Sequence, residues 1–272
     1  MPDCPPKTFF MQEGMEALPY KENVIIMKQK PSTLIKDELG ALKQNSDSVL
    51  NKTILFITVV LFIYCYFGSY SFFDKTFQDT PNPEYFRIIY HHVACFVLFF
   101  VVGLLYTKLI VKKNPKEMGL GFGDHKTGLV LCAAATVIMP LLGLSCVTDP
   151  EMVASYPLVD LHIFGQWYYV LGYFGSYLLY YIGWEYLFRG IGLFGTEGKM
   201  GPLGAILFTG MISALIHTSI GGFGKPMLET LSAIPAGLIF GWVAYKTKSI
   251  YYSLYMHIVI GFATDLAIFL LR

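Results

Sequence analysis

Several long apolar stretches, each of about 20 residues and nearly free of charge, limit what this chain can fold into. A helix of that length crosses the hydrocarbon core of a bilayer with its backbone amides bonded within the helix. The composition agrees, because 54% of the 272 residues are hydrophobic and only 14% are charged. We therefore expect an all-α, polytopic membrane helix bundle with seven transmembrane helices. The expected spans are 53–73, 88–110, 127–146, 166–195, 202–220, 228–246 and 250–271.

The basic residues between these spans predict the orientation, since Lys and Arg gather on the cytoplasmic side of a membrane. Lysines are frequent before the first span and after the second, whereas the connection 147–165 contains no Lys or Arg. That connection instead carries Asp149, Glu151 and Asp160. The alternation predicts a cytoplasmic N-terminus and an external C-terminus. An eighth, half-buried element at 151–163 is left open.

Residues 1–50 are polar and mixed in charge, and they lack the early apolar core of a cleavable signal peptide. We expect a loosely ordered cytoplasmic arm, with a short helix around 34–44, followed by the bundle at 51–272. The five cysteines are scattered without a CxxC pair, which favours packing roles over disulfides or metal binding. A net charge of +1 gives no indication of a nucleic-acid partner.

The fourth expected span contains two charged residues, Glu185 and Arg189. Four residues apart, they lie on one helix face. Charges at membrane depth are costly and usually mark a functional site or a paired interior. A structural ion pair is the competing interpretation. In either case we expect the two side chains to lie close together in the bundle interior.

His217 lies near the end of the fifth expected span, and Glu229 follows a glycine-rich turn and Pro226. Taken alone, His217 is typical of an interface residue, and Glu229 suits the positive end of the next helix dipole. His257 is different, because it lies about eight residues inside the last span, where a histidine needs polar partners. A satisfied structural histidine remains an alternative.

Together these residues place a glutamate, an arginine and two histidines on three of the last four helices. Such a set can activate a water molecule, with a carboxylate as base and histidines as acid or oxyanion stabiliser. There is no HExxH, and two histidines and a glutamate from separate helices are not a specific metal signature. We therefore predict no metal and no cofactor.

Over roughly residues 165–270, the sequence resembles the CPBP family of intramembrane proteases, which includes the CAAX prenyl endopeptidases and the bacteriocin-processing and self-immunity proteins. The resemblance rests on Glu185-x-x-x-Arg189-Gly190, on His217 about 30 residues later, and on His257 after the run 246–250. The segment 224–229 fits a bacterial branch of this family. The resemblance implies an intramembrane endopeptidase in a bacterial cell membrane, acting on a peptide or on a membrane or lipidated protein. It also implies that Glu185 and His217 activate water, that Arg189 supports Glu185, and that His257 stabilises the oxyanion.

The sequence departs from the family pattern at two positions. Trp184 replaces the first glutamate of the motif, and Gly261 replaces the side chain that follows the last histidine by four residues. Either Glu185 acts as base alone, or Glu229 supplies a second carboxylate, or the protein is a non-catalytic membrane scaffold or regulator. A small-solute transporter is disfavoured, because no internal repeat is evident.

Overall fold

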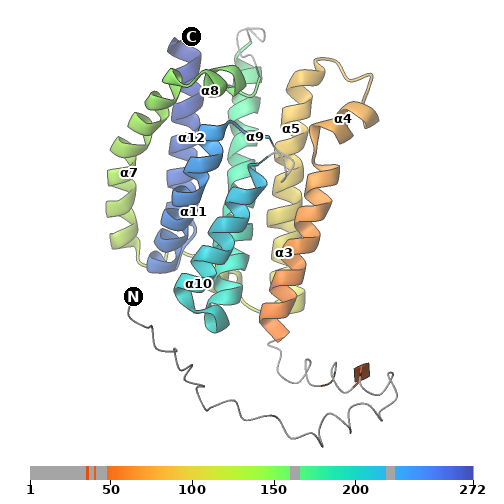
Figure 1. Ribbon diagram of the computed structural model, residues 1–272, viewed down its shortest axis with the longest axis vertical. Coiled ribbons are helices and arrows are strands. Elements are labelled where there is room, and N and C mark those ends of the chain that lie inside the picture. The colour runs from red at the N-terminus through yellow and green to blue at the C-terminus, as the bar shows by residue number, and fades with distance from the viewer. Residues whose placement is uncertain (1–34, 37–39, 41–47, 160–165, 219–223, 272) are drawn as a thin grey trace, which may run out of the picture. The chain divides into compact units, whose positions relative to one another are not determined.

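The computed structural model describes residues 35–36, 40, 48–159, 166–218 and 224–271. Contacts divide the chain into Met1–Ser46 and Asp47–Arg272. Most of the expected N-terminal arm, including the greater part of the helix expected around 34–44, lies outside the described residues. The second unit is a bundle of helices (Figure 1), and the described residues contain no strand.

The helices of the bundle follow one another with short connections. In chain order, the α-helices are α3 (Ser48–Phe67), α4 (Tyr70–Thr76), α5 (Pro83–Cys95), α6 (Val102–Leu105), α7 (His125–Ser145), α8 (Pro150–Ser155), α9 (Trp167–Glu185), α10 (Leu193–Ile216), α11 (Met227–Thr247) and α12 (Tyr251–Leu271). Three π-helical segments, η1 (Phe96–Val101), η2 (Tyr106–Val111) and η5 (Tyr186–Gly192), continue α5, α6 and α9, and two short 3₁₀ turns are η3 (Pro115–Met118) and η4 (Cys146–Thr148).

Six helical elements among the described residues are long and apolar enough to cross a membrane. They are Val49–Phe67, Pro83–Val111, His125–Thr148, Trp167–Ile216, Met227–Thr247 and Tyr251–Leu271. The fourth covers both expected spans 166–195 and 202–220, and it is broken at Gly201, where φ is 71° and ψ is 163°. The difference from the seven expected spans arises at this break. Of the open element at 151–163, the structure describes 151–159, which contain most of α8 and the residues that follow it; 160–163 lie outside the described residues.

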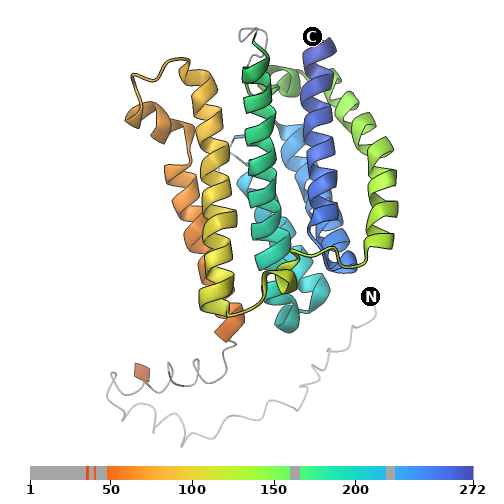
Figure 2. The same ribbon diagram turned by 180° about the vertical axis from the view of Figure 1, so that it is seen from behind.

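The order of the elements in space brings the C-terminal half together. Figures 1 and 2 show α9, α11 and α12 in the middle of the bundle, with α7 beside α12 and with α3 and α5 on the opposite side. The turn between α11 and α12 is fixed by two backbone hydrogen bonds, from Asp124 N to Thr247 O at 2.8 Å and from Ile250 N to Gly119 O at 3.0 Å. These bonds fix where α12 begins, and therefore where its polar residues lie.

The segment that carries the charged pair is the most enclosed part of the chain. Every residue from 183 to 196 is buried. Trp184 and Phe188 pack with Phe99 of η1 and Ile216 of α10 in one apolar cluster. A helix that is buried all round contacts protein rather than lipid. The charges of this segment therefore face the bundle interior.

Candidate active site

Glu185 and Arg189 form an ion pair inside the bundle. The Arg189 Nη1 to Glu185 Oε1 distance is 3.5 Å, and the side chains are 3% and 0% exposed. The four-residue spacing predicted this contact, and the cost of a lipid-facing charge predicted its interior position. Glu185 ends α9, and Arg189 lies in η5, so the pair lies where the helix changes to π geometry. Such π segments are common at functional sites.

Glu185 also bonds to His257 of α12. The His257 Nδ1 to Glu185 Oε1 distance is 2.8 Å. An ionised carboxylate only accepts hydrogen bonds, so Nδ1 is the protonated nitrogen and Nε2 is left for another partner. The imidazole packs on Tyr181, with ring centroids 4.4 Å apart, and on Phe240 at 5.3 Å. His257 is therefore held in orientation from both sides.

His217 follows the last residue of α10 and is oriented by the backbone. Its Nδ1 lies 2.7 Å from the carbonyl oxygen of Ser213, one helical turn earlier. A carbonyl oxygen accepts, so Nδ1 donates, and Nε2 of the neutral ring carries a lone pair. Nε2 lies 4.0 Å from Oε1 of Glu229. Trp184, at the position of the missing first glutamate, packs its ring edge-on at 5.5 Å from the His217 ring.

Glu229 lies in the first turn of α11, but its hydrogen bonds lead elsewhere. Its Oε2 accepts a bond of 2.6 Å from the Tyr156 hydroxyl, and Lys225 Nζ lies 3.7 Å from its Oε1. Lys225 also donates to the Tyr156 oxygen at 2.6 Å. The backbone amide of Met227, at the start of α11, instead donates a hydrogen bond of 3.0 Å to Glu151 Oε2 of α8. Glu229 thus lies where its charge suits the dipole of α11, as the sequence indicated, while its side chain bonds to Tyr156.

Tyr156 keeps its proton in this network. Burial and the neighbouring Glu229 carboxylate raise the pKa of Tyr156 well above its usual value. The hydroxyl is therefore a permanent donor to Glu229 at neutral pH, while Lys225 supplies a positive charge on the other side of the same oxygen.

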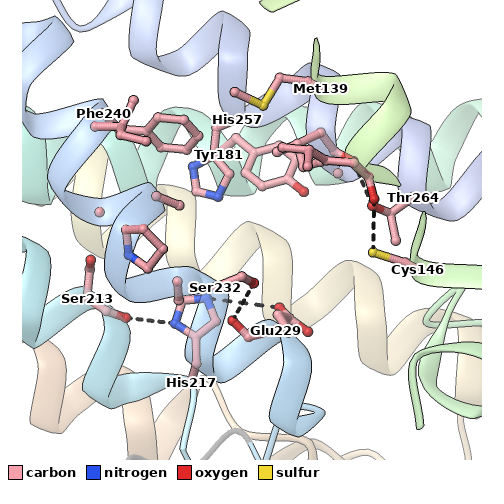
Figure 3. A pocket seen from close by; sticks show the side chains of 18 of the residues that line it. Met139, Cys146, Tyr181, Ser213, His217, Glu229, Ser232, Phe240, His257 and Thr264 are labelled. Carbon is pink, nitrogen blue, oxygen red and sulfur yellow. Dashed lines mark hydrogen bonds and ion pairs between the residues drawn. The ribbon is translucent and has the colours of Figure 1, made fainter. Parts of the chain in front are cut away.

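These groups surround a cavity of about 470 Å³ between α7, α8, α9, α10, α11 and α12. Figure 3 shows His217, Glu229, His257 and Tyr181 pointing into it. Arg189, Trp184 and Gly261 also line it. Glu185 is fully buried behind His257 and is not among the described residues that line the cavity. Both histidines and Glu229 thus line the same cavity, and Glu185 is connected to it through its hydrogen bond with His257.

Two neighbours of the site, Tyr156 and Tyr181, were missed from the sequence. Tyr156 lies in the connection after α8, far from its partners in sequence, and no local pattern marks it. Tyr181 lies one helical turn before Glu185, a spacing that places both on one face and was available as a signal. Asp265, two turns beyond His257, accepts a hydrogen bond of 2.5 Å from the Tyr173 hydroxyl. The Tyr173 oxygen in turn accepts a hydrogen bond from the backbone amide of Leu158. This last contact ties the connection before α9 to α12.

Metal ligation has no obvious site among the described residues, where no group of three or more His, Cys, Asp or Glu side chains is arranged to hold an ion.

Comparison with known proteins agrees with the sequence motifs. Residues 165–263 match the model of the Rce1-like family, described as type II CAAX prenyl endopeptidase Rce1-like. This confirms the resemblance to the CPBP and CAAX protease family over the segment that holds the charged pair, both histidines and Glu229. Comparisons with curated proteins and with solved structures gave no match.

Proposed function

We propose that the chain is an intramembrane endopeptidase, because residues 165–263 match a family of CAAX prenyl endopeptidases and the described residues contain helices able to cross a membrane. It hydrolyses a peptide bond in a peptide or in the tail of a membrane or lipidated protein. The observation that carries the proposal is the convergence of His217, Glu229 and His257 on one cavity.

His217 and Glu229 hold the attacking water in this proposal. The 4.0 Å separation of His217 Nε2 and Glu229 Oε1 is too long for a direct bond. A water about 2.8 Å from each atom would donate to both with an angle of about 90° at its oxygen, close to its own geometry. Two acceptors on one water draw off a proton as its oxygen attacks a carbonyl carbon.

The remaining steps use the same groups. The attack forms a C–O bond and places a negative charge on the carbonyl oxygen. His257 donates from Nε2 to this oxyanion while its Nδ1–H donates to the Glu185 carboxylate, so both ring nitrogens carry a proton in this step. The tetrahedral intermediate then collapses, the C–N bond breaks, and the proton taken from water passes to the leaving amine.

In this scheme, Glu185 and Arg189 support His257. The assignment of Glu185 as the base, implied by the family resemblance, competes with it and makes a different prediction. If Glu185 is the base, Glu229→Gln has little effect on the rate. If Glu229 is the base, Glu229→Gln lowers the rate about 100-fold or more.

We also propose seven membrane crossings, with the helical element Trp167–Ile216 divided into two at Gly201. A helix of 50 residues would be about 75 Å long, more than twice the thickness of a bilayer core. The distribution of lysines favours an N-terminus in the cytoplasm of a bacterial cell, and seven crossings then leave the C-terminus on the other side of the membrane.

The function is tested with the purified full-length protein in lipid nanodiscs and a library of fluorogenic peptides, some carrying a lipid tail. The wild type is expected to cleave a subset, and His217→Ala is expected to abolish the cleavage. Glu197→Gln is the matched control, because its ion pair with Lys248 lies outside the cavity. Absence of cleavage by the wild type on every peptide would favour the non-catalytic scaffold, to which the Trp184 substitution also points.

A further inference from the structure

Gly261 lies one helical turn beyond His257 on α12, and the space beside it is already filled. A Cβ at position 261 would overlap the hydroxyl oxygen of Tyr181, and its next contacts would be the ring carbon that carries this hydroxyl and a neighbour. The absence of a side chain at 261 therefore lets the Tyr181 hydroxyl reach the surface of α12. A polar group is thus present where the α12 residue itself offers none.

Tyr181 lies beside His257 at the wall of the cavity. It lies in α9, and its ring packs against the His257 ring with centroids 4.4 Å apart. Figure 3 shows the two side chains next to each other at the wall of the cavity, which both residues line. The Tyr181 residue is only 3% exposed. A donor in such an enclosed position is already oriented and acts more strongly than one in water.

We propose that Tyr181 is a catalytic residue whose hydroxyl donates a hydrogen bond to the oxyanion alongside His257 Nε2. The inference rests on the proposed function, because an oxyanion exists only if a peptide carbonyl is attacked in this cavity. Tyr181 gives up no proton in the cycle. Its O–H bond to the oxygen strengthens as the negative charge develops and weakens when the carbonyl re-forms on loss of the amine.

The alternative is that Tyr181 only packs. Its ring also stacks on Tyr177, with centroids 4.6 Å apart. Tyr181→Phe keeps both ring contacts and removes only the hydroxyl, so it separates the two roles. Tyr186→Phe is the matched control, because Tyr186 is equally buried in the same helical run and its hydroxyl bonds to Thr107 at 3.0 Å, outside the cavity.

The experiment compares the kinetics of both variants with those of the wild type, in nanodiscs, on the best peptide from the library. Tyr181→Phe should lower kcat by about 100-fold or more, with KM within about 2-fold, as for loss of one oxyanion donor. Tyr186→Phe should keep the wild-type kcat. Thermal unfolding midpoints of both variants verify that each is folded.

A rescue experiment adds a readout that a packing role would not produce. In Tyr181→Ala/Gly261→Asn, the space vacated by the phenol admits a carboxamide donor from α12. This double variant should turn over at least about 10-fold faster than Tyr181→Ala alone. Wild-type cleavage together with an unchanged kcat in Tyr181→Phe would overturn the inference and leave the proposed function standing. Absence of any wild-type cleavage would overturn both.

Discussion

The ion pair between Glu185 and Arg189 makes a quantitative prediction about stability. Glu185→Gln removes the carboxylate that faces both Arg189 and His257 and leaves a guanidinium 3% exposed without its counter-charge. At 3.5 Å, the pair interaction is about 5 kcal/mol at an effective dielectric constant of about 20. Removal of one partner of a buried pair costs about 3–5 kcal/mol, so we expect a loss in this range for Glu185→Gln.

The reverse substitution should cost less. Arg189→Gln leaves Glu185 charged, but His257 Nδ1, at 2.8 Å, remains as a partner that can carry the positive charge. The double variant Glu185→Gln/Arg189→Gln contains no unpaired charge at this position, so the two losses should not add. We expect a coupling energy of about 2 kcal/mol or more.

The assay is unfolding of the detergent-solubilised protein by SDS titration in mixed micelles, followed by tryptophan fluorescence. Glu197→Gln is the control, since its ion pair with Lys248 is solvent-exposed and should be worth less than about 1 kcal/mol. Additive losses, or losses below about 1 kcal/mol for both single variants, would refute the interpretation of Glu185 and Arg189 as a coupled buried pair.

Two further predictions concern a tyrosine that lines the cavity and a glycine in the turn before α7. Tyr156→Phe removes the 2.6 Å hydrogen bond to Glu229 and should lower kcat about 10-fold. Tyr168→Phe, a change at an exposed tyrosine outside the cavity, should leave kcat unchanged. Equal kcat values for the two variants would show that the Tyr156 hydroxyl has no part in the reaction. Gly123→Ala should lower the unfolding free energy by about 1–3 kcal/mol, because φ is +49° and a Cβ would overlap the carbonyl oxygen of Thr247. Gly198→Ala is its control, since a Cβ there meets open space. Equal unfolding midpoints for the two variants would contradict this reasoning.

The sequence predicted those parts of the site that depend on local spacing and on the cost of charge in a membrane. Glu185 and Arg189 were paired correctly because four residues of helix bring their side chains together. His257 was expected to need an interior polar partner, and it has one in Glu185. The sequence separated two spans between residues 195 and 202, and the structure has the non-helical residue Gly201 in that interval, although the element Trp167–Ile216 counts as one of six among the described residues.

Tertiary contacts decided what spacing left open. From the sequence, Glu229 suited the helix dipole or the cavity; in the structure it lies in the first turn of α11 and also lines the cavity, where Tyr156, 73 residues away in the chain, donates to it. Tyr181 was not singled out, although its spacing from Glu185 places both on one helix face, because the chain contains 19 tyrosines and this spacing alone does not distinguish a hydrogen-bond donor from a packing residue. Its place became visible only when the packing of α9 on α12 showed its hydroxyl beside Gly261.

The most direct test of the account is peptide cleavage in water enriched in ¹⁸O, followed by mass spectrometry of the products. Wild type in nanodiscs should release a product whose new carboxylate carries one ¹⁸O, and Glu229→Gln should form that product about 100-fold more slowly or worse. Glu197→Gln should match the wild type. Cleavage at the wild-type rate by Glu229→Gln, or a product without ¹⁸O, would contradict the claim that His217 and Glu229 deliver a water molecule to the peptide carbonyl.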